Sequence, residues 1–214
     1  MIFNMDTELK NSIHTGTTIL GIICKDGIVM AGDNRVSAGQ GLIIQKDYEK
    51  VYPLNDYLVF AGCGSATETQ KVAKLLTAEL KLKDLRSKSR PSVKKAASLL
   101  SNIQVSASAF ILGGFDENGE VSLYEIAGGF LNQVKDYTAS FGSGMPYVLG
   151  LLERQYKKGL SVKEGIELAK EAIKSSTQRD MASGNGIDIY SITKDGIKKE
   201  VGQEILQQFK DKEE

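Results

Sequence analysis

The chain has 214 residues, enough for one domain with a large hydrophobic core. Hydrophobic residues make up 41% and charged residues 25% of it, as is usual for a soluble globular protein. The formal net charge is zero, so we expect neither a nucleic acid nor an anionic membrane as a partner. The apolar runs are too short to span a bilayer, and the first residues lack the apolar centre of a signal peptide. We therefore expect a cytoplasmic protein.

Cysteine and histidine usage restricts the chemistry. Cys24 and Cys63 have neither disulfide nor metal-ligand spacing, and we expect both to be small buried side chains. The sole histidine, His14, lies near the N-terminus. A hydrolase built from the rest of the chain must use a lysine, a carboxylate or an α-amine as its base. We expect no metal site and no cofactor.

A β-hairpin is the first predicted element. Apolar runs cover Thr18–Lys25 and Gly27–Asp33, and the Asp-Gly pair between them is a strong hairpin signal. Since both runs are apolar on nearly every residue, we expect strands covered on both faces. The small, polar stretch Val36–Gln40 is predicted to be a loop. Further strands are predicted over residues 42–45, 50–54 and 57–61, and the last should end in a glycine-rich corner at 62–65.

Helical periodicity begins after this corner. It predicts a helix over residues 67–85 and a second helix whose first turn contains Pro91. Strands are predicted next, over 107–115, 120–126, 130–134 and 137–140. The last predicted elements are two helices, over 146–157 and 162–176, and a hairpin over 187–201. Two groups of strands and two pairs of helices indicate an α+β domain, arranged as a four-layer αββα sandwich. The basic stretch over residues 71–95 is interpreted as a solvated helix pair or a charged interface between subunits, in preference to a surface for an anionic partner.

Two hydroxyls follow a glycine at the start of the first strand, in Thr15-Gly16-Thr17-Thr18. Taken alone, Thr17 would be an ordinary threonine at a strand edge. If the chain is cut after Gly16, Thr17 becomes an N-terminal residue that carries both a nucleophile and a base, its own α-amine. That amine titrates at about 7.7–8, close to working pH. Glycine at position 16 lets the backbone bring the hydroxyl onto the preceding carbonyl, so that the chain can cut itself.

An acid and a base are predicted beside Thr17. A hairpin that runs out along the first strand and back along the second returns Asp33 to the side of Thr17. A buried lysine held by this carboxylate would favour the alkoxide form of the threonine. The residues alone leave Lys46 and Lys50 equally possible. The glycine-rich corner at 62–65 suggests either an oxyanion hole or a phosphate cradle, although it lacks the Walker lysine spacing.

Several ordered segments resemble those of archaeal-type proteasome β-subunits, over essentially the whole chain after Thr15. They are Thr15–Thr18, Lys25–Ala31, Asp33 with Arg35, Lys50-Val51-Tyr52, Ala61-Gly62, Gly142-Ser143-Gly144, Arg179-Asp180 and Ser183–Asp188. This resemblance implies the αββα sandwich of the N-terminal-nucleophile hydrolases. It also implies a propeptide, residues 1–16, removed by self-cleavage between Gly16 and Thr17, and a single catalytic domain over 17–214.

The resemblance assigns roles to individual residues. Thr17 looks like the nucleophile, Asp33 like its acidic partner, and Lys50 like the catalytic lysine, which settles the choice against Lys46. The remaining assignments are Gly62 for the oxyanion hole, Ser143, Asp180 and Ser183 for orienting the amine and its water, and Val36, Phe60 and Gly64 for the pocket before the scissile bond. An apolar, aromatic-lined pocket predicts cleavage after large hydrophobic residues.

The implied function is that of a threonine endopeptidase that degrades unfolded polypeptides inside a closed chamber. The implied partners are other β-subunits in heptameric rings, rings of α-subunits, and a regulatory ATPase acting through the α-ring. One alternative is a non-catalytic ring subunit, but the presence of Thr17, Asp33 and Lys50 speaks against it. A second is an N-terminal-nucleophile amidohydrolase that acts on small amides, against which the 179–184 loop and the Lys50-Val51-Tyr52 run both speak.

Overall fold

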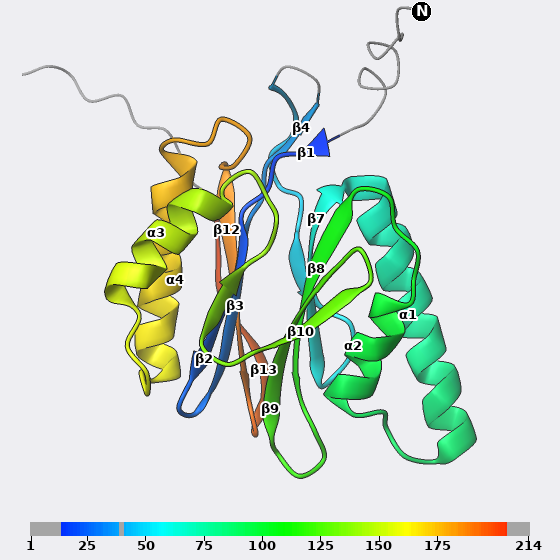
Figure 1. Ribbon diagram of the computed structural model, residues 1–214. Helices are drawn as coiled ribbons and strands as arrows, with labels where there is room; N and C mark the ends of the chain where they lie inside the picture. The colour runs from blue at the N-terminus through cyan, green and yellow to red at the C-terminus, as the bar shows by residue number, and fades with distance from the viewer. Residues whose placement is uncertain (1–13, 39–40, 205–214) are drawn as a thin grey trace, which may run out of the picture.

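The computed structural model describes residues 14–38 and 41–204, and they form four layers. Two β-sheets pack face to face, α1 and α2 cover the outer face of one sheet, and α3 and α4 cover the other (Figure 1). The predicted αββα sandwich is therefore confirmed.

The first sheet holds the strands that follow Thr17. Its order is β11-β2-β3-β12-β13, and neighbouring strands run antiparallel. Its strands are β2 (Ile19–Cys24), β3 (Gly27–Asp33), β11 (Tyr137–Ala139), β12 (Gly186–Thr193) and β13 (Gly196–Glu204). β2 and β3 form the predicted hairpin, in which Ile19 lies opposite Gly32. This register brings Asp33 to the level of Thr18.

The second sheet has the order β1-β7-β8-β9-β10, and β6 also pairs with β7. Its strands are β1 (His14–Thr15), β6 (Val51–Pro53), β7 (Leu58–Ser65), β8 (Ser108–Phe115), β9 (Val121–Ala127) and β10 (Phe130–Val134). β6 pairs with residues 59–61 of β7, and β1 pairs with residues 64 and 65. Since β8 takes the other edge of β7, β6 and β1 follow one another along the same edge.

Each of the four helices in the described part of the chain begins with a local signal in the sequence. They are α1 (Ala66–Ser87), α2 (Val93–Ser101), α3 (Met145–Gln155) and α4 (Val162–Thr177). Ser65, Ser92 and Ser161 accept a hydrogen bond from a backbone N–H of the first turn, and Glu164 completes a capping box at α4. α3 instead carries Pro146 in its first turn, where no backbone donor is needed.

Three hydrophobic clusters hold the layers together. One lies between α3, α4 and the first sheet, and it includes Leu152 and Ile173. A second lies between α1, α2 and the second sheet and includes Phe60 and Leu76. The third fills the space between the sheets and includes Ile111. As the sequence pattern predicts, β3 is buried along its whole length because both of its faces are covered.

Three predicted boundaries are wrong. The 36–40 stretch is not all loop, because Val36–Ala38 forms β4, which pairs with β5 (Leu42–Gln45). The glycine-rich corner at 62–65 is not a loop, because β7 continues through it to Ser65. Pro91 lies outside the second helix, since Ser92 is the N-cap of α2.

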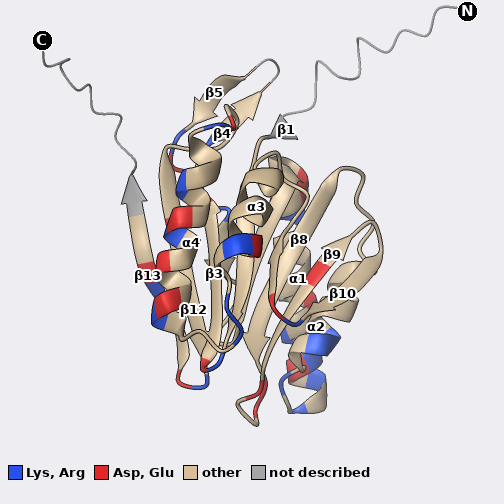
Figure 2. Ribbon diagram, turned by 60° about the vertical axis from the view of Figure 1, so that its left-hand side comes forward, with Lys and Arg blue, Asp and Glu red and all other residues tan. Residues whose placement is uncertain are grey.

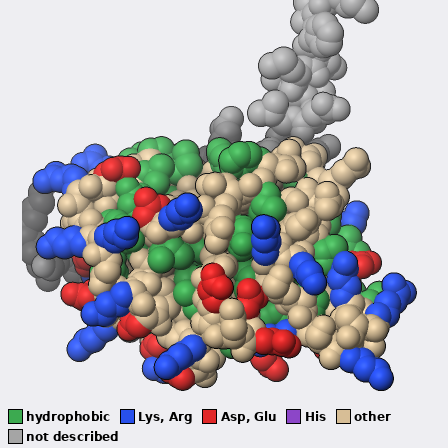
Figure 3. Space-filling view, turned by 60° about the horizontal axis from the view of Figure 1, so that its bottom comes forward, with side chains coloured by type: hydrophobic (Ala, Val, Ile, Leu, Met, Phe, Trp, Pro, Cys, Tyr) green, Lys and Arg blue, Asp and Glu red, His purple; other side chains and the backbone are tan. Residues whose placement is uncertain are grey.

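Charged side chains of both signs are spread over the surface. Figure 2 shows Lys and Arg mixed with Asp and Glu on α4 and on the pair α1 and α2. The end of the sandwich opposite β1 also carries both signs, set among apolar side chains (Figure 3). Within the described ranges, no helix is both long and apolar enough to cross a membrane.

Candidate active site

Thr17 lies where the chain crosses from one sheet to the other. β1 belongs to the second sheet and β2 to the first, so residues 16–18 form the crossing. Thr17 and Thr18 are both buried there, with exposed fractions of 0% and 1%. A threonine buried between two sheets is held in place much more firmly than one at an open strand edge.

Lys50 meets the crossing because β6 and β1 share one edge of β7. The backbone of Lys50 lies opposite Gly62 and that of Thr15 opposite Gly64, so the start of β6 faces the end of β1. The Lys50 ammonium donates hydrogen bonds to the Gly16 carbonyl at 2.7 Å and to Asp33 Oδ1 at 2.8 Å. The carbonyl that precedes Thr17 is therefore in contact with a buried cation.

Asp33 accepts a hydrogen bond from each of four donors. Oδ1 accepts from the Lys50 ammonium and from the Thr18 N–H, both at 2.8 Å. Oδ2 accepts from the backbone N–H groups of Arg35 at 3.0 Å and Gly184 at 2.9 Å. The carboxylate is fully buried, and these bonds join three segments of the chain around it.

Burial lowers the pKa of Lys50 below the usual lysine value. The negative charges of Asp33 and Asp180 act in the opposite direction but do not offset this desolvation. A lysine with a lowered pKa loses its proton more easily than one in water. Such a group is suited to exchanging a proton with a neighbouring hydroxyl.

Ser143, Asp180 and Ser183 form one hydrogen-bonded group. The Thr17 N–H donates to Ser143 Oγ at 3.1 Å, and Ser143 in turn donates to Asp180 Oδ2 at 2.6 Å. Ser183 donates to the same oxygen at 2.6 Å. The structure thus brings these three predicted residues together, and Ser143 connects them to the backbone nitrogen of Thr17.

Two glycines allow the 142–144 turn to approach the crossing. A Cβ on Gly142 would lie 2.1 Å from the Thr17 carbonyl oxygen, and one on Gly144 would lie 1.8 Å from Thr18 Oγ1. The Gly144 N–H donates to that same Thr17 carbonyl at 3.2 Å. Glycine at both positions is needed to seat Ser143 beside Thr17.

Gly62, the predicted oxyanion-hole residue, lies inside β7. Its N–H donates to the Lys50 carbonyl at 3.1 Å, within the contact between β6 and β7. To serve an oxyanion it would have to give up this bond. The role of Gly62 stays a prediction.

The three predicted pocket residues are placed differently from one another. Val36 on β4 and Gly64 on β7 lie on strands that flank β1. Phe60 is fully buried beneath α1, with its ring 5.7 Å from Tyr52 and 5.3 Å from Phe110. Val36 and Gly64 thus lie on strands in contact with β1, whereas Phe60 belongs to the core between β7 and α1.

Sequence reasoning gave no role to two residues at the site. Arg35 donates from its side chain to Asn185 and to the Met181 carbonyl, both at 2.7 Å, and so holds the loop that carries Ser183. Ser176 on α4 lies 2.5 Å from Thr18 Oγ1. Arg35 had a signal, since it lies two residues from Asp33 in a segment that resembles the family. Ser176 had none, because a serine facing inward from a helix is common.

Neither cysteine has the properties of a competing nucleophile. Both are buried and free. Burial raises the pKa of the Cys24 thiol to about 12 and also raises that of Cys63. Among the described residues, no cluster of three or more His, Cys, Asp and Glu has the arrangement to hold a metal ion.

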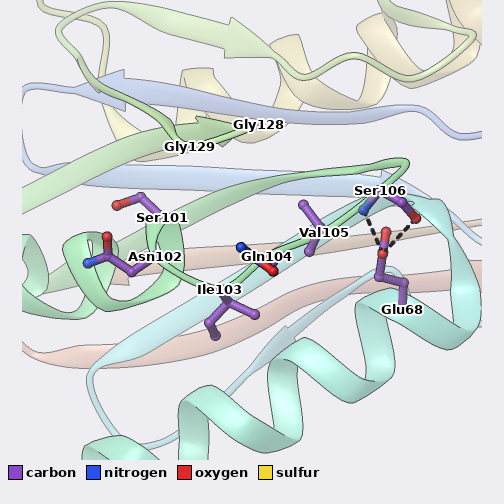
Figure 4. Close-up of a pocket in the computed structure, with 9 residues that line it drawn as sticks. All are labelled: Glu68, Ser101, Asn102, Ile103, Gln104, Val105, Ser106, Gly128 and Gly129. Carbon is purple, nitrogen blue, oxygen red and sulfur yellow. Dashed lines mark hydrogen bonds between the residues drawn. The ribbon is translucent and has the colours of Figure 1, made fainter.

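A cavity of about 550 Å³ lies in the second sheet's half of the molecule, beside the first turn of α1 (Figure 4). Its lining consists of Glu68, Ser101, Asn102, Ile103, Gln104, Val105, Ser106, Gly128 and Gly129. The lining contains no residue predicted to be catalytic. The cavity is separate from the Thr17 cluster.

Comparison with known proteins identifies the family of the chain. Residues 13–192 match the proteasome family, described as proteasome subunit. The chain is 39% identical over 190 residues to the proteasome subunit beta of Nanoarchaeum equitans, covering 86% of this chain and 96% of that protein. It is 39% identical over 197 residues to the proteasome subunit beta of Archaeoglobus profundus, covering 88% and 90%. It is 37% identical over 189 residues to proteasome subunit beta 2 of Pyrococcus abyssi, covering 86% and 89%.

Proposed function

Because this chain belongs to the proteasome β-subunit family, we propose that it is a catalytic subunit, a threonine endopeptidase with Thr17 as its nucleophile. The observation that carries the proposal is the position of the Lys50 ammonium. It lies 2.7 Å from the carbonyl oxygen of Gly16, which belongs to the bond that must be cut, and 2.8 Å from Asp33. A structural subunit has no need of a buried cation on this one carbonyl.

Self-cleavage is the first reaction in the proposal. The Thr17 hydroxyl attacks the Gly16 carbonyl, and the negative charge develops on the oxygen that Lys50 contacts. The hydroxyl proton passes to the Thr17 nitrogen, which becomes an amine when the amide breaks. Collapse of this intermediate breaks the Gly16–Thr17 amide and leaves an ester on the Thr17 oxygen. Water hydrolyses the ester, which releases residues 1–16 and frees the α-amine of Thr17.

Cleavage of substrates repeats these steps with a base added. The freed α-amine takes the proton of the Thr17 hydroxyl, directly or through one water, while Ser143, Asp180 and Ser183 hold the amine in place. The Lys50 cation, held in place by Asp33, stabilises the alkoxide. Collapse of the tetrahedral intermediate breaks the peptide bond, and the departing amine takes up the proton from the α-amine. Water then hydrolyses the acyl ester on Thr17 and releases the second product.

Substrate, assembly and location follow from the same proposal. As a proteasome β-subunit, the chain assembles with other subunits into a core particle. We propose that this particle contains heptameric β-rings between α-rings, receives unfolded polypeptides through a regulatory ATPase, and works in the cytoplasm. The apolar Val36, on a strand beside β1, supports cleavage after large hydrophobic residues.

The deciding experiment is co-assembly with an α-subunit, followed by N-terminal sequencing and a fluorogenic-peptide assay. We expect a chain that begins at Thr17 and cleaves the peptide, and a Thr17→Ala variant that does neither. Lys50→Ala should also abolish cleavage. Lys46→Ala is the matched control, because Lys46 is exposed, and it should be nearly silent. An intact wild-type chain in an assembled, inactive particle would favour the non-catalytic alternative.

A further inference from the structure

We propose that Ser176 and Thr18 are positioning residues that hold Thr17 in its reactive place, an inference that rests on the function proposed above. Ser176 belongs to α4, four residues before Asp180, and its exposed fraction is 0%. Its Oγ lies 2.5 Å from Thr18 Oγ1, and Thr18 Oγ1 lies 2.8 Å from Ser183 Oγ. A helix on the outer layer thus reaches the crossing through one hydroxyl.

Each hydroxyl has only one proton, and this fixes the direction of every hydrogen bond in the series from Ser176 through Thr18 and Ser183 to Asp180. Asp180 is an acceptor, so Ser183 donates to it at 2.6 Å. Having no second proton, Ser183 must accept from Thr18, and Thr18 must then accept from Ser176. Three buried hydroxyls are therefore aligned head to tail, and the series ends on Asp180.

Asp180 joins this series to Thr17. Its Oδ2 also accepts from Ser143 at 2.6 Å, and Ser143 accepts from the Thr17 nitrogen at 3.1 Å. The hydrogen-bond network runs from the Thr17 nitrogen through Ser143, Asp180 and Ser183 to the side chain of the adjacent residue, Thr18. Thr17 is consequently fixed from both sides by the same carboxylate.

The backbone of Thr18 is fixed as firmly as its side chain. Its N–H donates to Asp33 Oδ1 at 2.8 Å, and its carbonyl accepts from the Asp33 N–H at 3.0 Å. A Cβ on Gly144 would lie 2.9 Å from Ser176 Oγ as well as 1.8 Å from Thr18 Oγ1. The space around the two hydroxyls is therefore filled, and the Thr18 side chain is confined to one position.

Loss of the Ser176 hydroxyl should lower the rate without weakening substrate binding. Thr18 Oγ1 would lose its donor, and its side chain would gain rotational freedom directly behind the nucleophile. Small displacements of a reacting group are costly in rate. Ser176 lies behind the first sheet, away from the β7 edge that β1 occupies, so KM should not change.

The test measures kcat and KM for peptide cleavage by the assembled, processed particle. Ser176→Ala should reduce kcat about 5–30-fold and leave KM within about twofold. Ser175→Ala, one position earlier on the same helix, is the matched control and should match wild type. Thr18→Val removes the second hydroxyl with little change of shape and should reduce kcat similarly. The double variant should be no slower than Thr18→Val alone, because both changes interrupt one series.

The outcomes separate this inference from the proposed function. A wild-type particle that cannot cleave the peptide refutes the function itself. If wild type cleaves and Ser176→Ala keeps full kcat, or raises KM with kcat unchanged, the positioning role is wrong. Independent, multiplying effects of the two substitutions would also overturn it. Should Ser176→Ala fail to assemble, an unchanged kcat in Thr18→Val is sufficient to refute the inference.

Discussion

Asp33 shows at the scale of one residue how the site is stabilised. Two backbone N–H groups, those of Arg35 and Gly184, satisfy one of its oxygens, and Thr18 with Lys50 satisfies the other. A buried carboxylate with four donors has little need of water. A buried lysine beside it, however, depends on that negative charge.

We predict that Asp33→Asn destabilises the fold by about 3–5 kcal/mol and abolishes cleavage. The amide would present a donor to groups that are themselves donors, and Lys50 would be left without its partner. Urea unfolding gives the stability, and the peptide assay gives the activity.

The double variant Asp33→Asn/Lys50→Met should recover part of the lost stability but none of the activity. Removing both charges avoids an unpaired buried ion, while the reaction still lacks its lysine. A double variant that is less stable than either single variant would show that the pair is not an isolated unit.

Glycine requirements also differ sharply from place to place. Gly64 has φ +101°, and a Cβ there would lie 1.9 Å from the Ala107 carbonyl oxygen. Gly150 lies inside α3, and a Cβ added there would meet no atom within 4 Å beyond the backbone of its own helix. Gly64→Ala should therefore destabilise the chain strongly, whereas Gly150→Ala should stabilise it by about 0.5–1 kcal/mol. Thermal unfolding of the two variants measures this contrast.

At the scale of elements, Glu68 ties the start of α1 to the segment that leads into β8. Its carboxylate accepts from the backbone N–H groups of Ser106 and Ala107 and from the hydroxyls of Ser106 and Ser108. Figure 4 shows it at the wall of the cavity, bonded to Ser106. One side chain thus closes the connection between α2 and the second sheet.

These bonds make the stability of the chain depend on pH. Burial raises the pKa of Glu68, but the hydrogen bonds from Ser108, Ser106 and Ala107 outweigh it, so the net pKa is lowered. The stability that Glu68 adds is therefore complete above its unfolded-state pKa of about 4.3 and is lost as the pH falls through the lower folded-state value.

Glu68→Gln should cost about 1–2 kcal/mol at pH 7, because the neutral amide accepts these bonds less well. The difference from wild type should shrink below about pH 4, where Glu68 itself becomes protonated. Urea unfolding of both proteins from about pH 7 down to about pH 3.5 tests this linkage. A difference that is constant over the whole range would mean that the charge plays no part.

The order of the elements could be read from the sequence because strong local signals mark it. The Asp-Gly turn sets the β2–β3 hairpin, and helical periodicity sets α1 and α4. β4 and the end of β7 could not be read, since short polar or glycine-rich stretches become strands only through their partners. Gly64 is in a strand because Thr15 and Ser108 pair with it from either side.

The candidate site could likewise be predicted from the sequence only in part. Hairpin geometry was sufficient to bring Asp33 to the crossing, but not to choose Lys50 over Lys46. That choice depends on two strands, β6 and β1, meeting on one edge of β7, and strand pairing is not local. Ser176 lies beyond prediction for a related reason, since its importance comes from a residue 158 positions away.

At the scale of the whole molecule, one end of the sandwich is unusually apolar. All residues of β5 are exposed, among them Leu42 at 73% and Ile44 at 54%, and Met181 beside Gly41 is exposed at 65%. Exposed apolar groups of this kind are typical of surfaces that another protein covers. In a subunit of a larger particle, β5 is suited to that use.

We predict that Leu42→Ser together with Ile44→Ser leaves the stability of the isolated chain within about 0.5 kcal/mol of wild type. Co-assembly should nevertheless be impaired, because the exposed apolar area is reduced. Native mass spectrometry of the particle measures the second effect. Full assembly by the double variant would show that β5 stays open to solvent.

The pairing of β1 with β7 also bears on the proposed self-cleavage. Among the described residues, it joins His14 to Ser65 and Thr15 to Gly64. While Gly16–Thr17 is intact, the covalent link holds β1 against β7 at an effective concentration of order millimolar or more. If the bond is cut as proposed, that local concentration disappears, and β1 must compete with an incoming polypeptide for the edge of β7. The proposed cleavage of one amide would thus convert a tethered strand into a free competitor for that edge.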